Sequence, residues 1–162
     1  MLDLPPELAG FLNELGYLWP EVDEVKLIEL GQHWLAPSDT LREVEQQATA
    51  AMRTAVSDHT GDAITAFQAR WNADKSAVNV LDRAAAGTPV VGVALFICAG
   101  VVLALKINVI IQLTILLIEI IEAIATAPET FGGSLLEIPV FKKLTDMAIN
   151  FIINKAMEAI LG

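Results

Sequence analysis

The sequence predicts an all-α fold: a helical bundle built on a long antiparallel helix hairpin, with an additional long hydrophobic helix and a C-terminal helix. Three observations predict it. Apolar residues recur at steps of three and four along most of the chain, which is the period of an α-helix. No stretch of useful length alternates as a strand does, and an apolar content of 54% argues against disorder. Because the chain has 162 residues, we expect a single domain over residues 1–162.

A short leader precedes the hairpin. Two prolines and an acid at residues 5–7 predict a first helix that continues to Leu15, because proline is tolerated in the first turn and negative charge there suits the helix dipole. Gly16 offers a stop for this helix. Trp19 must leave the α region because Pro20 follows it, so these two residues predict an aromatic connector.

The first arm of the hairpin begins at the acidic run 21–24. This run suits the first turn of a helix that has a broad apolar face up to Leu35. Pro37 breaks or kinks that helix. The helical pattern restarts with Thr40 and Glu43 at the spacing of a capping box, and it continues to the turn of the hairpin.

A turn that ends at Gly61 leads into the second arm. The arm starts with one apolar, partly aromatic stripe, whose members recur at a spacing of four: Ala63, Phe67 and Trp71. We expect this helix to cover residues 63–86 and to end at the Gly-Thr-Pro of residues 87–89. Residues 1–88 are therefore predicted to be the leader plus an acidic hairpin.

Residues 89–162 predict hydrophobic helices. Ala84 to Leu105 is 22 residues without a charge, and a helix of roughly 33 Å would cross a bilayer core. The first helix, which we expect over residues 89–127, then carries one narrow polar stripe. Its members fall at steps of 4, 7, 3 and 4: Asn108, Gln112, Glu119, Glu122 and Thr126. After a loop with prolines and glycines, a last helix is predicted from about Val140 to Leu161.

Two smaller features belong to the same hydrophobic helix. Lys106 interrupts the apolar run, where a bare charge is costly unless it reaches the edge or pairs. We expect its apolar stem in the bundle and its amine at the rim. Gly100 and Ala104 form a pair of small residues that allows close helix contact.

The charge is uneven along the chain. Residues 1–88 carry 14 acids and 6 bases, whereas residues 89–162 carry 6 acids and 4 bases, which together give the net charge of −10. The only basic pair is Lys142 and Lys143. A nucleic-acid partner is therefore not expected, and an anionic ligand would be repelled.

Motifs for catalysis, cofactors or metals are missing. His33 and His59 lie far apart, and neither has a second ligand at metal-binding spacing. Cys98 lies in an apolar run and is interpreted as a small buried hydrophobe. Glu119 and Glu122 share a helix face, but a solvated stripe explains them better than a catalytic pair. We expect no enzyme activity, no cofactor and no metal.

Several segments together resemble a known family. They are Pro5-Pro6-Glu7, Leu12-x-x-Leu15-Gly16, Trp19-Pro20-x-x-Asp23-Glu24, Trp34, the stripe from Gly61 to Trp71, and Ala104-Leu-Lys106. The combination resembles the WXG-like N-terminal domain of actinobacterial polymorphic toxins of the CpnT type. The resemblance implies a helical bundle that marks a large protein for type VII export and pairs with small WXG-type helpers.

Two departures qualify the resemblance. His59 stands where the tryptophan of the motif would be, two residues before Gly61. The export tag Tyr-x-x-x-Asp/Glu is also missing after the hairpin, so we expect a partner to supply it.

The first residues have neither a basic nor an apolar signal region, so no Sec-type signal peptide is expected. The predicted location is secreted or associated with the cell envelope, by a non-Sec route.

The resulting hypothesis is a non-enzymatic domain for secretion targeting and protein interaction. It would dock helix-on-helix with a WXG-type helper or with a second copy, and be recognised by the type VII machinery. The residues expected to form the seam or the docking surface are Trp19, Pro20, Trp34, Leu41, Gly61, Phe67 and Trp71. Core packing explains the three tryptophans better than docking does.

An alternative hypothesis belongs to another class: a membrane-inserting or pore-forming module that uses the hydrophobic helix 89–127. In this alternative, the stripe of Asn108, Gln112, Glu119 and Glu122 would line the pore.

Overall fold

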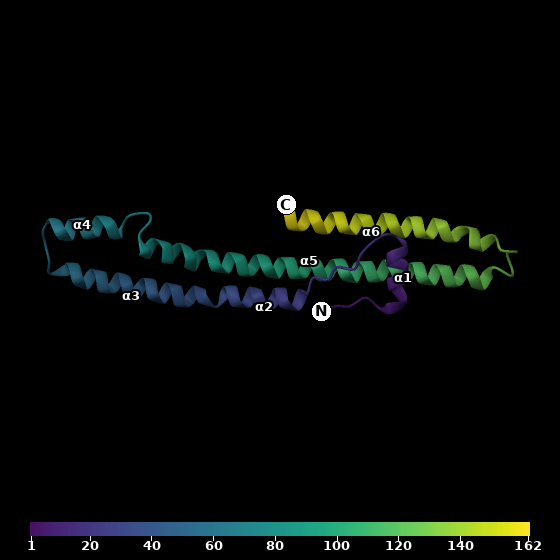
Figure 1. Ribbon diagram of the computed structural model, residues 1–162, viewed down its shortest axis with the longest axis horizontal. Helices are drawn as coiled ribbons and strands as arrows, with labels where there is room; N and C mark the ends of the chain where they lie inside the picture. Colours follow the sequence, from purple (N-terminus) through teal and green to yellow (C-terminus); the bar gives the residue numbers. More distant parts are fainter. The chain divides into compact units, whose positions relative to one another are not determined.

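The computed structural model describes residues 1–162 and confirms the all-α fold, with no strand (Figure 1). The elements follow in the order α1 (Pro6–Glu14), α2 (Glu24–Leu35), α3 (Pro37–Ser57), α4 (Asp62–Trp71), α5 (Ala77–Thr126), the 3-10 helix η1 (Gly133–Glu137) and α6 (Ile138–Leu161). The chain divides into two compact units. Unit 1 comprises Met1–Val25 with Cys98–Gly162, and unit 2 comprises Lys26–Ile97, so that α5 contributes to both. The prediction of one domain over residues 1–162 stays a prediction.

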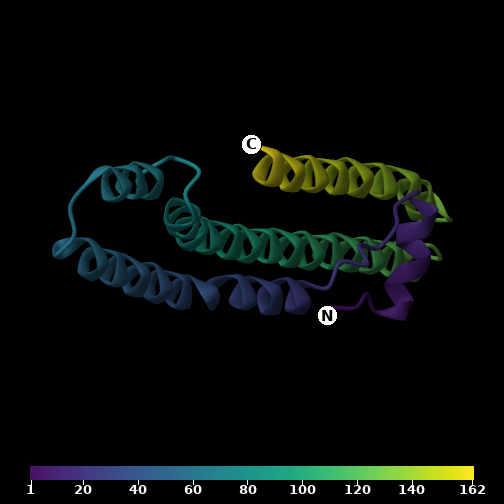
Figure 2. The same cartoon turned by 60° about the vertical axis from the view of Figure 1, so that its left-hand side comes forward.

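Unit 1 is built around the second part of α5. Helix α6 returns antiparallel beside it, and α1 lies across it rather than along it (Figures 1 and 2). The core cluster of this unit consists of large aliphatic side chains: Leu8, Leu12, Val109, Leu113 and Ile149. Each fully buried side chain of this size contributes roughly 1.5–3 kcal/mol, so these residues fix the leader on α5.

Hydrogen bonds of two hydroxyl groups stabilise the connection between α5 and α6. Gly132 takes a positive φ of 83°, which is the left-handed conformation that glycine adopts readily. The Ser134 hydroxyl is buried and donates to the carbonyl oxygen of Ala123 at 2.7 Å. Its own backbone N–H donates to the Thr130 hydroxyl at 3.2 Å. The predicted loop after α5 is thereby confirmed, and α6 starts two residues before the predicted Val140.

Unit 2 contains α2 from Lys26, together with α3, α4 and the first part of α5. Its buried residues are all small, and the largest is a valine: Gly31, Ser38, Val78, Ala85 and Gly92. Helices α2 and α5 approach each other backbone to backbone. A Cβ added to Gly92 would lie 2.8 Å from the carbonyl oxygen of Gly31, and one added to Gly31 would lie 2.6 Å from the Phe96 ring. This unit therefore packs through close contact of glycines with half-buried large side chains beside them, and it has no fully buried large side chain.

The predicted turns of the hairpin are confirmed in part. Helix α2 ends at Leu35 and α3 starts at Pro37, as the proline predicts. Helix α3 ends at Ser57, and Gly61, with a φ of 120°, precedes α4. The predicted capping box of Thr40 and Glu43 is wrong, because the helix begins earlier, at Pro37, with proline in its first turn and no side-chain cap.

The predicted single helix over residues 63–86 is wrong in two respects: it is interrupted within this range, and its second part does not end at residue 86. Helix α4 ends at Trp71, and a new helix begins at Ala77 because Ser76 caps it: the Ser76 hydroxyl accepts the backbone N–H of Asn79 at 3.3 Å. This helix, α5, does not stop at residues 87–89 but continues to Thr126 with Pro89 inside it.

A buried hydroxyl explains how α5 passes through Pro89. A proline has no N–H, so the carbonyl four residues earlier, that of Ala85, loses its helical partner. The Ser38 hydroxyl of α3 donates to this carbonyl oxygen at 2.9 Å, and both residues are buried. The tertiary contact supplies the hydrogen bond that the sequence of α5 alone lacks, and the helix remains unbroken.

Candidate interaction site

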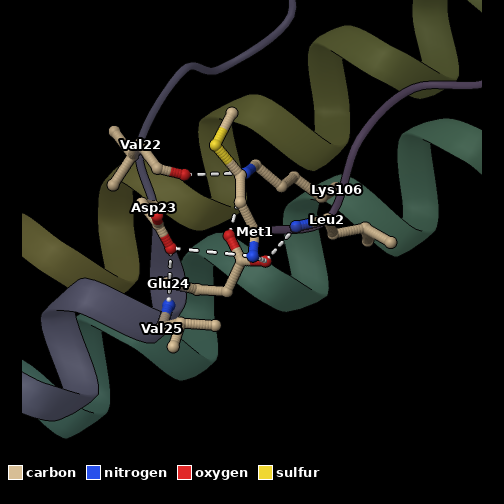
Figure 3. Close-up of polar contacts among 7 residues, drawn as sticks. All are labelled: Met1, Leu2, Val22, Asp23, Glu24, Val25 and Lys106. Carbon is tan, nitrogen blue, oxygen red and sulfur yellow. Dashed lines mark hydrogen bonds and ion pairs between the residues drawn. The ribbon is translucent and has the colours of Figure 1, made fainter.

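Lys106 lies on α5 in unit 1 and is fully buried. Its Nζ donates to Glu24 Oε2 at 2.9 Å and to the backbone carbonyl of Val22 at 2.6 Å (Figure 3). Glu24, itself only 6% exposed, also accepts the backbone N–H of Leu2. The N-terminal ammonium of Met1 lies 3.9 Å from the same carboxylate. The expectation of an amine at the rim is therefore wrong, because Lys106 reaches a buried carboxylate instead of water.

The surroundings of this ion pair favour its charged form. The hydrogen bond from Lys106, supported by backbone N–H donors, lowers the pKa of Glu24 from 4.5 to about 2, against the effect of burial. Glu24 is also the first residue of α2, where negative charge suits the helix dipole. Lys106 Nζ lies 5.8 Å from the centroid of the Trp19 ring, within the range of a cation–π contact. In this cluster the positive charge of Lys106 and the negative charge of Glu24 neutralise each other. The contact holds the leader against α5.

A second polar contact ties the leader to α6. The Tyr17 hydroxyl donates to Asp146 Oδ1 at 2.8 Å. Burial, followed by the hydrogen bond and the charge of Asp146, raises the pKa of Tyr17 from 10.0 to about 12. Lys142 on α6 is paired with Glu14 at the end of α1. Three elements of unit 1, namely the leader, α5 and α6, are thus joined by specific polar contacts.

Trp19 and Pro20, expected from the sequence as an aromatic connector, lie in unit 1. Trp19 is half-buried against the core cluster, and its indole Nε1 is buried with no hydrogen-bond partner. Pro20 lines a small apolar hollow of about 190 Å³ together with Leu18, which is 87% exposed. Trp19 therefore packs in the core, and Leu18 is the exposed apolar residue of this connector.

The remaining residues proposed for the hairpin lie in unit 2. Trp34 on α2 is 41% exposed, and Phe67 on α4 is 43% exposed, whereas Leu41 and Trp71 are half-buried. The rings of Phe67 and Trp71 meet with centroids 6.0 Å apart. Helix α4 buries none of its residues fully. The structure thus brings Phe67 and Trp71 together and leaves the face of α4 that carries them open.

The predicted polar stripe lies on α5 in unit 1, in two settings. Asn108 is exposed and donates to the carbonyl of Ala104 at 2.8 Å, beside a hollow of about 360 Å³ between α5 and α6. Gln112 is half-buried. Glu119 and Glu122 line a second hollow, of about 200 Å³, to which Glu137 also contributes. No ion pair joins any of these three carboxylates to a base.

An exposed apolar face lies beside the polar stripe, and sequence reasoning did not identify it. We name it the isoleucine face; its members are Ile107, Ile111, Ile115, Ile118, Ile121 and Ile124, which are 43–57% exposed. The buried positions of the same helix segment, such as Leu113 and Leu116, lie on the other side. At about 100° per residue, the two sets occupy nearly opposite sides of α5. The signal was present as isoleucine at helical spacing, but periodicity alone does not separate a buried face from an exposed one.

His33 and His59 are both exposed, and no group of three or more His, Cys, Asp or Glu side chains is placed to hold a metal ion. The pair of small residues predicted for close contact does not make one: a Cβ on Gly100 would meet nothing within 4 Å. The close approach of helices occurs at Gly31 and Gly92 instead.

Comparison with known proteins gives one match. Residues 3–142 match the model of the family described as the WXG100-like domain. No curated protein and no solved structure matches the chain. The matched residues include the leader, the hairpin, all of α5 and the start of α6.

Proposed function

The chain belongs to the family of WXG100-like domains, and from this premise we propose that it is a non-enzymatic domain for secretion targeting and protein interaction. The family is linked with type VII secretion and with helical association, so the protein is a helical component related to that export route. We further propose that it acts as the targeting part of a toxin-like protein of the actinobacterial CpnT type, exported by a non-Sec route to the cell envelope or the medium.

The proposed mechanism is docking of the hairpin, helix on helix, with a small WXG-type helper. One observation supports it above the others. Unit 2 fully buries no side chain larger than valine, whereas five of its large apolar side chains are 41–45% exposed: Ile28, Leu30, Trp34, Val44 and Phe67. Full burial of such a side chain contributes roughly 1.5–3 kcal/mol, so a partner that covers several of them gains several kcal/mol.

The stripe on α4 is the most specific part of this surface. Phe67 and Trp71 already contact each other, so their relative position is set before binding. A partner that covers these two rings loses little side-chain entropy, which favours binding. Leu41 and Trp34 lie on the other arm, and we propose that they complete the seam, with Gly61 setting the turn between the arms. Trp19 and Pro20 hold the leader in unit 1.

The test is co-expression of the full chain with the WXG-type gene that neighbours its own gene. We expect a complex that stays intact through size-exclusion chromatography. Phe67→Asp should weaken it at least tenfold, because a charge would be placed in the seam. Glu137→Gln is the matched control in unit 1, and it should bind as the wild type does. A chain that purifies alone and monomeric beside an expressed helper would refute the docking proposal.

A second function is favoured by one observation on α5. This helix is long and apolar enough to cross a membrane: it contains an 18-residue stretch with a mean hydropathy of 2.6, of which only 17% is buried. We propose as the alternative that α5 enters a bilayer and that Asn108, Gln112, Glu119 and Glu122 face a pore. Liposome leakage that Glu119→Leu with Glu122→Leu abolishes would support this alternative. A chain that neither binds vesicles nor releases their contents would exclude it.

A further inference from the structure

The isoleucine face is left uncovered by every element of unit 1. The leader and α1 cover the side of α5 that carries Lys106 and Leu113. Helix α6 lies beside another side, where Leu105 and Asn108 line a hollow together with Phe151. Ile111, in the middle of the face, is 47% exposed. An uncovered apolar face along several turns of one helix marks an interaction surface.

The spacing on this face suits a second long helix. Four members of the face and two exposed neighbours, Thr114 and Ala125, follow one another at steps of 4, 3, 4, 3 and 4: Ile107, Ile111, Thr114, Ile118, Ile121 and Ala125. This is the seven-residue repeat of a coiled-coil seam, whose period of about 3.5 residues keeps one side chain row against a partner helix. Gly100 and Ala104 continue the repeat toward the N-terminus, and a Cβ on Gly100 would meet nothing within 4 Å. A partner backbone can therefore approach closely at that end.

The charges beside the face decide what kind of helix fits. Glu122 and Glu119 lie along one edge of the face, and with Glu137 they line the same hollow of about 200 Å³. No base is paired with any of the three. The one lysine of α5, Lys106, is buried on another side of the helix and paired with Glu24. The charged residues of α5 along this edge are thus all acidic.

A second copy of this chain complements that edge poorly, because the chain carries a net charge of −10 and the one exposed base of α5, Arg83, belongs to unit 2 and not to the helix segment that carries the face. An anionic membrane surface would be repelled for the same reason. A helix with lysine or arginine beside its apolar seam would place those bases opposite Glu119 and Glu122.

We propose that the isoleucine face is a docking site for a separate helical protein that carries an apolar heptad seam flanked by basic residues. This site goes beyond the proposed hairpin docking, since it uses only residues of unit 1. The apolar contacts hold the two helices together, and the acidic edge selects the partner and fixes its direction.

The experiment uses the full chain and two synthetic helical peptides of about four heptads, both with leucine at the a and d positions. One carries lysine at e and g, and the other carries glutamate there. Binding is measured by fluorescence anisotropy at two salt concentrations. We expect the lysine peptide to bind at least tenfold more tightly than the glutamate peptide.

The variant Ile111→Asp distinguishes binding through the apolar seam from nonspecific electrostatic attraction. It makes the chain more acidic, yet we expect it to lose at least tenfold in affinity for the lysine peptide, because the centre of the seam is lost. Leu136→Asp is the matched control: it adds the same charge at a side chain that is 79% exposed and lies outside the face, and it should bind as the wild type does. Glu119→Lys with Glu122→Lys is a second variant at surface positions, and it should invert the preference between the peptides.

Three results would overturn the proposal. Equal binding of the lysine peptide by wild type and Ile111→Asp would mean that the seam is not used. A dimer of the chain alone that Ile111→Asp dissociates in sedimentation equilibrium would make a second copy the occupant. Binding to phosphatidylcholine vesicles with phosphatidylglycerol that Ile111→Asp abolishes would make the occupant a bilayer. Failure in any of these three leaves the hairpin proposal standing, because that proposal depends on unit 2.

Discussion

Unit 1 and unit 2 share helix α5 but pack against it in different ways. In unit 1, large side chains from the leader and α6 meet Val109 and Leu113 and exclude water. In unit 2, Gly31 of α2 and Gly92 of α5 bring two backbones together beside the half-buried Phe96, and no large side chain is fully buried. The first arrangement buries apolar area within the unit itself. The second buries little of it and keeps a broad apolar surface open.

If the proposed docking is correct, the difference separates the stable part of the chain from the part that binds. Apolar burial is the main favourable term in folding, so unit 1 should hold most of the free energy of unfolding. Unit 2 relies on close backbone contact and on one buried hydrogen bond from Ser38. Segments that bind partners are commonly drawn from the less stable part of a protein. The predictions below test this asymmetry, beginning with the change that should have the largest effect.

Leu113→Ala tests the core of unit 1. Leu113 is fully buried, so truncation should lower the free energy of unfolding by about 2–5 kcal/mol. The measurement is urea unfolding followed by circular dichroism. Ile111→Ala is the control two residues away: its side chain is 47% exposed, so it should cost no more than about half as much. Equal costs for the two changes would contradict the assignment of the core to this side of α5.

Gly92→Ala tests the backbone contact of unit 2. A Cβ there would lie 2.8 Å from the carbonyl oxygen of Gly31 and 2.9 Å from Leu35 Cγ, and overpacking of this kind costs about 1–3 kcal/mol. Gly87→Ala is the matched control on the same helix. Its Cβ would meet nothing within 4 Å, so it should gain up to about 1 kcal/mol from helix propensity. Hydrogen exchange in α2 and the first part of α5 should report opposite signs for the two variants.

Ser38→Ala tests the hydrogen bond that replaces the missing N–H of Pro89. It leaves the Ala85 carbonyl buried without a partner, which costs about 1–3 kcal/mol. In a Pro89→Ala background, residue 89 supplies a backbone N–H to the same carbonyl, so Ser38→Ala should cost much less. A double-mutant cycle of unfolding free energies measures this coupling. If the two substitutions are additive, the explanation for the unbroken helix is incorrect.

The pH dependence of unit 1 should show the smallest effect. The pKa of Glu24 is 4.5 when the chain is unfolded and about 2 when it is folded, so its ion pair stabilises fully above the higher value. This contribution is lost as the pH falls from 4.5 through about 2. Glu24→Gln should therefore flatten the stability profile over this range and leave unit 2 unchanged. A profile that keeps the slope of the wild type would show that other carboxylates cause it.

The alkaline side offers a companion measurement for Tyr17. Its pKa rises from 10.0 unfolded to about 12 folded, so its contribution is complete below the lower value and lost as the pH climbs toward the higher one. Tyr17→Phe should remove this loss.

The helices were predictable because local rules decide them, and the exceptions depend on distant contacts. The stop at Gly16, the break at Pro37 and the turn before Asp62 all follow from glycine and proline and are confirmed. Pro89 obeys the same rule in isolation. Its effect is cancelled by Ser38, which bonds to Ala85 across 47 residues of the chain, and no local pattern shows that pairing.

The candidate site shows the same limit for charges and faces. A lone lysine in an apolar run was recognised as costly, but its partner lies 82 residues away, in the first turn of another helix. The sequence shows both the acidic first turn of α2 and Lys106. It does not show that they are in contact, because this depends on the tertiary fold. Likewise, the isoleucine spacing was visible, but its exposure depends on where α1 and α6 pack.

The position of Trp19 has a consequence for spectroscopy. Its indole is half-buried with the Lys106 ammonium 5.8 Å from the ring, whereas Trp34 is 41% exposed in unit 2. Indole emission responds to local electric fields and to contact with water, so the three tryptophans of the chain are intrinsic optical reporters with distinct environments. In a variant that keeps only Trp19, a shift in the wavelength of the emission maximum would report the detachment of the leader from α5. One that keeps only Trp34 would report when a partner covers the hairpin.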